Sequence, residues 1–257
     1  MTSFVPFALD QPVQIIAHRG YSARAPENTI AALSLALDAG ANAVEFDLHT
    51  ASDGTPVLLH DDTLDRTTNG RGYVTGCAPD DLALLDAGSW FNSDFAGEPV
   101  PALRDALNAI EPRVHTIFSE IKGVRRRRDI EAIVSVTRDA GLLERTVFIS
   151  MDWGLLDEVR RYEADALLGP IVEHAARIDQ AFARVSGDAR SLLDFDARIL
   201  LARPELTRRA HGAGIPLAVW TVDDVVEADR LFELGVRRIT TNEVGRLMAW
   251  AEMLPAS

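Results

Sequence analysis

Residues 102–253 repeat one pattern, in which a helical segment is followed by a short apolar strand segment. Helices are expected at 102–110, 127–140, 153–163, 174–185, 203–212, 223–234 and 243–253, and strands at 114–121, 146–150, 166–172, 190–194, 216–222 and 236–241. Gly141, Gly214 and Gly235 stand where helices pass into strands, as expected of C-terminal helix caps. Alternation of this kind is typical of a parallel sheet covered by helices.

Two further strands precede this region, at 13–17 and 42–49. The helix between them opens at 26–29 (Pro-Glu-Asn-Thr) and is closed by Gly40, and we expect Glu27 to complement its positive N-terminus. About eight strands, each followed by a helix, favour an α/β fold and within it a closed (β/α)₈ TIM barrel, which commonly has about 250 residues. The alternative is an open doubly wound sheet. Its dinucleotide-binding form is disfavoured, because no G-x-G-x-x-G follows the first strand.

After the second strand the chain turns tightly at 52–54 and returns through 55–60. The next stretch, about 61–101, is rich in Asp, Gly, Thr and Asn and breaks the alternation. A structureless loop of that length is improbable inside a compact domain, so we expect a small folded insertion after the second strand. We expect residues 1–257 to form a single barrel domain that carries this insertion.

Three acidic residues fall at expected strand ends, where barrels of this type form their active sites. Glu45 and Asp47 are two residues apart, so they share one face of their strand, and Glu120 on a later strand could join them. A hard divalent cation such as Mg²⁺ or Ca²⁺ binds a set of carboxylates and waters. The alternative is that these acids form structural ion pairs with Arg19 and Lys122, but three converging carboxylates would repel one another without a cation.

Two histidines and two cations complete the same group. His18 and His60 suggest a general base and a general acid. Arg19 can bind two phosphoryl oxygens at once, whereas Lys122 would act as a point charge. Trp220 lies near another strand end, which makes it a candidate for substrate contact. A metal, an arginine, a lysine and two histidines together favour in-line phosphoryl transfer.

Composition excludes several partners. The formal net charge of −13 argues against nucleic acid or an anionic membrane as the main partner, although not against a small anionic substrate. No apolar run approaches the ~18 residues of a membrane span, and residues 1–10 show no secretory signal. The single cysteine, Cys77, excludes an internal disulfide framework, so we expect a reducing, cytoplasmic location.

The order and spacing of these residues resemble the glycerophosphodiester phosphodiesterase family. The resemblance covers about residues 14–245 and rests on the segments His18-Arg19-Gly20, Pro26-Glu27-Asn28-Thr29, Glu45-x-Asp47, Asp53-Gly54, His60-Asp61, Arg66-Thr67-Thr68, Glu120-Ile121-Lys122 and Trp220-Thr221-Val222. It implies a (β/α)₈ barrel with an insertion after the second strand. It also implies metal-dependent hydrolysis of glycerophosphodiesters to an alcohol and glycerol 3-phosphate.

Carried over to this sequence, the resemblance implies roles for the site residues. Glu45, Asp47 and Glu120 would bind a divalent metal, Mg²⁺ or Ca²⁺, and Arg19 and Lys122 would contact the phosphate. His18 would be the base and His60 the acid, although the two roles could be exchanged. The nucleophile is either water or the substrate's own glycerol hydroxyl, through a cyclic phosphate.

Two positions depart from the family pattern. Asp223 stands where the family often has Asn after Trp-Thr-Val, and Thr241-Asn242-Glu243 replaces the usual Thr-Asp-x-Pro. Neither adjoins a proposed ligand in sequence, so we expect them to affect substrate fit rather than catalysis.

Other functions remain to be compared. A lysophospholipase D-type activity on lysophospholipids would favour an apolar entrance, and a non-catalytic glycerophosphodiester-binding barrel would lack a histidine or a carboxylate. A metal-dependent amide hydrolase usually carries an H-x-H pair on the first strand, which is absent. The arginine run 125–128 follows the third barrel strand, so we expect it on the catalytic face, where it would attract an anionic substrate.

Overall fold

The first strand, β1 (Gln14–Ala17), pairs in parallel with both β2 (Ala43–Thr50) and β9 (Arg238–Thr241). This double pairing closes the sheet. The other barrel strands lie between β2 and β9 in chain order: β4 (Thr116–Ile121), β5 (Thr146–Ser150), β6 (Leu167–Val172), β7 (Leu193–Asp196) and β8 (Leu217–Trp220). The computed structural model, which describes residues 12–254, therefore confirms the eight-stranded parallel barrel and not the open sheet.

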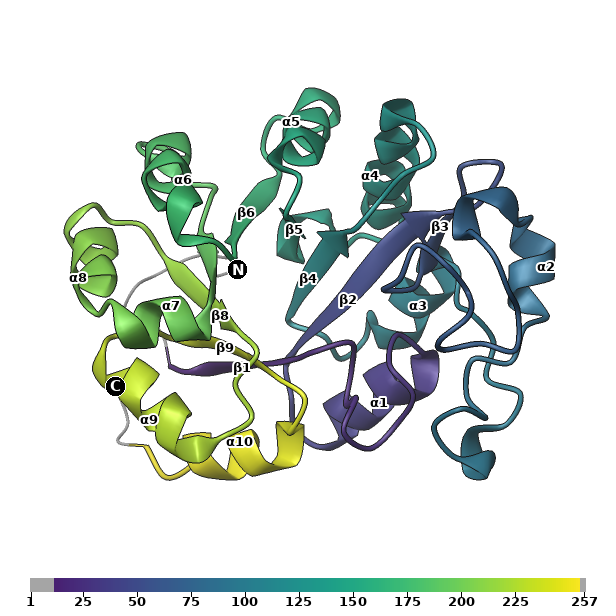
Figure 1. The fold of residues 1–257 in the computed structure, drawn as a ribbon, viewed down its shortest axis with the longest axis horizontal. Coiled ribbons are helices and arrows are strands. Elements are labelled where there is room, and N and C mark those ends of the chain that lie inside the picture. The colour runs from purple at the N-terminus through teal and green to yellow at the C-terminus, as the bar shows by residue number, and fades with distance from the viewer. Residues whose placement is uncertain (1–11, 255–257) are drawn as a thin grey trace.

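Helices surround the strands on the outside of the barrel (Figure 1). They are α1 (Ile30–Asp38), α3 (Leu103–Ile110), α4 (Ile130–Asp139), α5 (Trp153–Tyr162), α6 (Ile178–Val185), α7 (Ala197–Ala202), α8 (Glu205–Gly212), α9 (Val225–Glu233) and α10 (Val244–Ala251). Their positions agree with the expected alternation, apart from α7. This helix, which the sequence pattern did not indicate, begins directly after β7, where the Asp196 side chain accepts a hydrogen bond of 2.9 Å from the Arg198 N–H.

The insertion after β2 is folded. A short strand, β3 (Pro56–Leu58), returns antiparallel to β2, and the segment beyond it contains η1 (Val74–Gly76), α2 (Pro79–Ala83) and η2 (Ser93–Phe95). Figure 1 shows α2 beside the barrel, outside the ring of helices. Leu64, Val74 and Leu82 are buried with Val57 in a separate apolar cluster, so the insertion packs on the β3 hairpin.

Two apolar layers enclose the barrel wall. Inside the barrel lie Ile16, Ala43, Phe118, Val147, Ile149, Leu167, Ile171, Leu192 and Ala218. Alternate residues of the same strands, such as Phe46, Phe148 and Phe195, are buried in the two outer clusters, which also contain buried residues of the surrounding helices. The polar side chains that point inward therefore lie above this layer of apolar side chains, at the carboxyl ends of the strands.

Some expectations fall partly outside the described residues. The interpretation of residues 1–10 as lacking a signal concerns positions that the structure does not describe, and the single-domain assignment of 1–257 stays a prediction. Across residues 12–254, none of the helices combines the length and the apolar character that crossing a bilayer requires.

Candidate active site

A cavity of about 150 Å³ opens at the carboxyl ends of the barrel strands. Seven of the eight residues singled out from the sequence line it: His18, Arg19, Glu45, His60, Glu120, Lys122 and Trp220. The eighth, Asp47, is fully buried beside them. The structure thus brings together all eight residues, although the first and the last are about 200 positions apart in the sequence.

Strand register creates the carboxylate cluster. Glu45 and Asp47 lie on the same face of β2, and the parallel pairing of β2 with β4 sets Asp47 directly opposite Glu120. One oxygen from each of the three residues lies within 4.8 Å of the others. Like charges that face each other in a sheet are destabilising, so this arrangement needs a compensating positive charge.

The three carboxyl groups have different electrostatic environments. Burial, followed by the charges of Asp47 and Glu120, raises the pKa of Glu45 well above its usual value. Burial and the charge of Asp47 likewise raise the pKa of Glu120 to about 7. Burial also acts to raise the pKa of Asp47, but nearby positive groups, Arg19 foremost, hold it below its usual value. The cluster therefore contains one stable carboxylate and two groups that ionise reluctantly.

These carboxyl groups fit a hard divalent cation. Oε1 of Glu45 and Oδ1 of Asp47 are buried and lack a hydrogen-bond partner within residues 12–254. Buried oxygens without a partner are costly in the absence of a ligand, and oxygen donors are those that Mg²⁺ and Ca²⁺ prefer.

The turn after β1 orients Arg19 toward this cluster. Arg19 adopts a left-handed backbone conformation, with φ of 54°, and its N–H donates a hydrogen bond of 2.9 Å to Oε2 of Glu45. Its Nε lies 3.1 Å from Oδ2 of Asp47. Gly20 makes the turn possible, because a Cβ atom there would lie 2.5 Å from the Ala32 carbonyl carbon on α1.

The segment 26–29 holds the site together rather than only starting a helix. Helix α1 begins at Ile30, and Thr29 is its N-cap, with Oγ1 accepting a hydrogen bond of 3.1 Å from the Ala32 N–H. The Asn28 amide donates to Oδ2 of Asp47 at 2.8 Å and accepts from the Asp47 N–H at 3.0 Å. The expected role of Glu27 at the helix N-terminus is therefore replaced by ion pairs with Arg19 and Arg66, both at 2.8 Å.

His60 is held by a chain of charged groups that begins at Arg19. Glu27 binds both Arg19 and Arg66, and Arg66 donates to both oxygens of Asp61, at 2.7 and 2.9 Å. These bonds hold the pKa of Asp61 well below its usual value, with the Arg66 hydrogen bond as the largest cause. Nδ1 of His60 lies 2.6 Å from Oδ1 of this carboxylate and must donate to it, which leaves Nε2 for the substrate.

His18 has a different environment. Its Nδ1 lies 2.7 Å from Oδ1 of Asn242, and its Nε2 lies 3.9 Å from Oε2 of Glu45. Burial, and then the positive charge of Arg19, lower the pKa of His18 to about 4. The His18 ring is therefore neutral near pH 7, and its partner is an amide, whereas the partner of His60 is a carboxylate.

Lys122 and Trp220 also line the cavity. Nζ of Lys122 is 3.0 Å from Oε1 of Glu120. Although burial acts to lower the pKa of Lys122, Glu120 and Asp47 raise it above its usual value, so the ammonium is retained. Nε1 of Trp220 is a buried donor that has no partner among the described residues, and it lines the cavity.

The sequence interpretation missed Asp194. This residue on β7 lines the cavity and is buried, and its Oδ1 has no partner within the described chain. Burial, and then the charge of Glu120, raise its pKa well above the usual value. An acidic residue inside the apolar run 192–195 was the available signal, of the same kind as Glu45 and Asp47.

The two departures from the family pattern lie next to His18, and their expected effect on substrate fit stays a prediction. Asn242 contacts His18 directly, and the Asp223 carboxylate accepts from both the backbone N–H and the side-chain amide of Asn242, at 2.7 and 2.8 Å. They are far from His18 in sequence but are brought to it by the pairing of β1 with β9. Both positions therefore bear on a histidine of the site.

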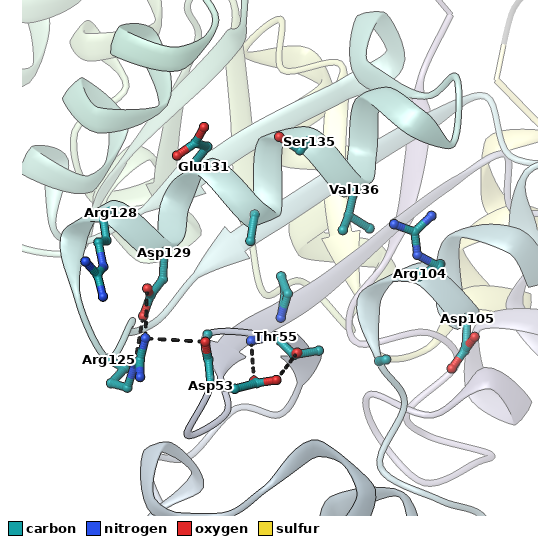
Figure 2. A pocket seen from close by; sticks show the side chains of 14 residues that line it. Asp53, Thr55, Arg104, Asp105, Arg125, Arg128, Asp129, Glu131, Ser135 and Val136 are labelled. Carbon is teal, nitrogen blue, oxygen red and sulfur yellow. Dashed lines mark hydrogen bonds and ion pairs between the residues drawn. The ribbon is translucent and has the colours of Figure 1, made fainter.

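The arginine run follows the carboxyl end of β4, as expected, but Arg125 and Arg128 line a second cavity. Arg125 donates to the Ser52 carbonyl at 2.6 Å and lies 3.2 Å from Oδ2 of Asp129. Figure 2 shows Arg125 between Asp129 and Asp53, in a broad cavity of about 720 Å³ that shares no lining residue with the site above. Arg125 ties α4 to the β2–β3 turn, and the attraction of substrate by this run stays a prediction.

Comparison with known proteins agrees with this geometry. The sequence profile of the glycerophosphoryl diester phosphodiesterase family matches residues 18–246. A glycerophosphodiester phosphodiesterase of Caldanaerobacter subterraneus subsp. tengcongensis is 32% identical over 231 residues, which cover 89% of this chain and 93% of that protein.

Solved structures show the same fold. A glycerophosphodiester phosphodiesterase of Agrobacterium tumefaciens superposes with a TM-score of 0.79 at 26% identity, covering 92% of this chain and 99% of that one. A phosphodiesterase of Oleispira antarctica, in complex with the product sn-glycerol-3-phosphate, superposes with a TM-score of 0.83 at 26% identity, covering 94% and 97%.

Proposed function

This chain belongs to the glycerophosphoryl diester phosphodiesterase family, and from that premise we propose that it hydrolyses glycerophosphodiesters to an alcohol and sn-glycerol 3-phosphate. The observation that carries the proposal is the convergence of three buried carboxyl groups, two histidines and two cations on one small cavity. The product bound to the Oleispira antarctica phosphodiesterase supports the same substrate class.

Glu45, Asp47 and Glu120 are the proposed ligands of a divalent cation, Mg²⁺ or Ca²⁺. When bound, the cation supplies positive charge to the phosphoryl oxygens. Arg19 and Lys122 add two further positive charges at the same place. Since Arg19 uses Nη1 on Glu27 and Nε on Asp47, we assign its Nη2 donor to the phosphoryl group. Trp220 donates its free Nε1–H to a substrate oxygen.

His18 acts as the general base. As a neutral ring whose Nδ1–H is bound to Asn242, it has a lone pair on Nε2 that can take the proton of the nucleophile. The nucleophile is water or the glycerol hydroxyl of the substrate itself, and the role of His18 is the same in both cases. The proton leaves the attacking oxygen as the new P–O bond forms.

His60 acts as the general acid. Asp61 orients the ring through Nδ1, so that a proton on Nε2 can be given to the leaving alcohol oxygen as its bond to phosphorus breaks. This assignment follows from the two different partners: a neutral amide for His18 and a carboxylate for His60. A cytoplasmic location is proposed only from the cysteine usage, a single free Cys77.

The experiment is an assay of the released head-group alcohol, choline or ethanolamine, which hydrolysis of a glycerophosphodiester and of a lysophospholipid would both produce. Glycerophosphocholine, glycerophosphoethanolamine and a lysophospholipid are each tested with Mg²⁺, with Ca²⁺ and with chelator. Activity is expected on the first two substrates, with either metal, and its loss is expected in chelator and in His18→Ala and Glu45→Ala. The exposed His115→Ala serves as the control. Full activity in chelator or in either site variant would refute the mechanism, and a preference for the lysophospholipid would favour the lysophospholipase D-type alternative.

A further inference from the structure

Asn242 and Asp223 form a hydrogen-bonded unit behind His18, in which Asp223 has no role in the proposed mechanism. His18 follows β1 and Asn242 follows β9, and the pairing of Ala17 with Thr241 brings the two side chains together. The His18 N–H also donates to the Thr241 carbonyl at 2.9 Å. Nδ1 of His18 then lies 2.7 Å from Oδ1 of Asn242.

Asp223 decides which way the Asn242 amide faces. Nδ2 of Asn242 is 2.8 Å from Oδ2 of Asp223, and a carboxylate can only accept. A flipped amide would set its oxygen against that carboxylate. Ser22 agrees with the observed orientation, since its hydroxyl donates to Oδ1 of Asn242 at 2.8 Å. The amide oxygen therefore faces His18, and Nδ1 of His18 must carry a proton.

The Asp223 carboxylate is itself held in place. The Asn242 N–H donates to its Oδ1 at 2.7 Å, and the Thr241 hydroxyl donates to the same oxygen at 2.9 Å. The Glu243 N–H donates to this hydroxyl at 3.0 Å, which directs the hydroxyl proton to Asp223. Every member of the chain from Glu243 to His18 therefore has one consistent set of donors and acceptors, and a network satisfied in this way is rigid.

The chemical result differs from that of the pair formed by His60 and Asp61. The negative charge of Asp223 reaches His18 only through a neutral amide, so His18 gains orientation without a carboxylate partner.

We propose that Asn242 and Asp223 are positioning residues that fix the orientation of the His18 ring, with Nδ1 protonated and donating to Asn242 and with Nε2 directed to the active site. The proposal rests on the proposed function for its catalytic consequence. The protonation of Nδ1 is a property of the protein without substrate and can be measured independently of activity.

The test compares the wild type with Asp223→Asn, Asn242→Asp and the exchanged double variant Asp223→Asn/Asn242→Asp. Asp224→Asn, the same change at the adjacent, half-buried N-cap of α9, is the matched control, since asparagine also caps helices. Two quantities are measured: kcat and KM on glycerophosphocholine, and ¹⁵N chemical shifts of histidine-labelled protein. The His18 signals are assigned by their loss in His18→Gln.

In the wild type we expect a protonated Nδ1 on His18. Each single variant should lower kcat by about 10- to 100-fold, with a smaller change in KM, and should alter the His18 shifts. In the double variant the amide at 223 again faces a carboxylate at 242, so kcat should recover most of the loss. Asp224→Asn should behave as the wild type.

Some outcomes would overturn the proposal. They are an unprotonated Nδ1 in the wild type, full activity in Asp223→Asn, or a folded double variant no better than the single ones. If the variants fail to fold, the wild-type shifts alone still decide whether Nδ1 is protonated. If the wild type hydrolyses no glycerophosphodiester but shows the expected shifts, the proposed function fails while the positioning of His18 stands.

Discussion

Nε of Arg19 lies 3.1 Å from Oδ2 of Asp47, so one carboxylate of the buried cluster already has a cationic partner within the chain. Glu120 has Lys122 as its partner, yet burial and the charge of Asp47 raise the pKa values of both Glu120 and Glu45. A divalent cation would therefore compete with protons for these two groups. Metal affinity should accordingly rise with pH.

Metal binding should stabilise the fold through Glu45. At a concentration 100 times the dissociation constant, Mg²⁺ or Ca²⁺ should stabilise the wild type by about 2.7 kcal/mol and raise its Tm. Glu45→Gln should lose most of that rise, because the amide cannot supply a charged ligand. In chelator the same variant should be at least as stable as the wild type, since it removes repulsion. Thermal unfolding measures both effects, with the exposed Glu131→Gln as control, and an undiminished metal response in Glu45→Gln would contradict the ligand assignment.

The acid and base roles can be separated by the leaving group. His60→Gln should lower kcat/KM on glycerophosphocholine by about 10²- to 10⁴-fold. On a glycerophosphodiester of p-nitrophenol the loss should be far smaller, because an acidic phenol leaves without a proton. His18→Gln should lose activity on both substrates, since the nucleophile still needs a base. Steady-state kinetics on the two esters checks this, and equal losses for His60→Gln on both would reject its role as acid.

Arg66 should couple the insertion to the catalytic centre. It binds Glu27 and Asp61 together, so Arg66→Ala should release Asp61 and leave His60 poorly oriented. We expect a fall in kcat and faster limited proteolysis within 61–101. The exposed Arg71→Ala, in the same insertion, should change neither. Retention of both properties in Arg66→Ala would show that the interaction is not required.

Asp194 should make stability fall as pH rises. Burial raises its folded-state pKa, so between about pH 4 and that value the folded protein binds a proton that the unfolded chain has lost. Stability due to this group is thus fully present below about pH 4 and declines above it, by at most about 1.4 kcal/mol per pH unit. Asp194→Asn removes this pH dependence. The urea midpoint of the variant should therefore exceed that of the wild type by an amount that grows with pH. The measurement is made in chelator with the exposed Asp80→Asn as control, and a constant difference across pH would contradict it.

The barrel and most of the site were predictable because they depend on local patterns. Glycine-punctuated alternation indicated the strands and helices, and a two-residue spacing set Glu45 and Asp47 on one face. The parallel neighbour then placed Glu120 beside them. Site residues at the carboxyl ends of parallel strands can be predicted from sequence, because those ends meet at one edge of the sheet.

What the sequence did not indicate depends on contacts between distant segments. His18 and Asn242 are 224 positions apart, and only closure of the barrel joins them. Glu27 was assigned to a helix N-terminus, but the helix starts later and Glu27 meets Arg66, 39 positions away. Asp194 was taken as the last residue of a strand whose true end is Asp196.

The pairing of β1 with β9 has a consequence for synthesis of the protein. Because the Asn242 partner of His18 directly follows β9, a ribosome must release the chain at least through residue 242 before the proposed base can be oriented. Contacts of such high sequence separation form slowly. A growing chain can therefore bring Glu45, Asp47 and Glu120 together before His18 is oriented. Hydrolysis would begin only when β9 pairs with β1 and closes the barrel.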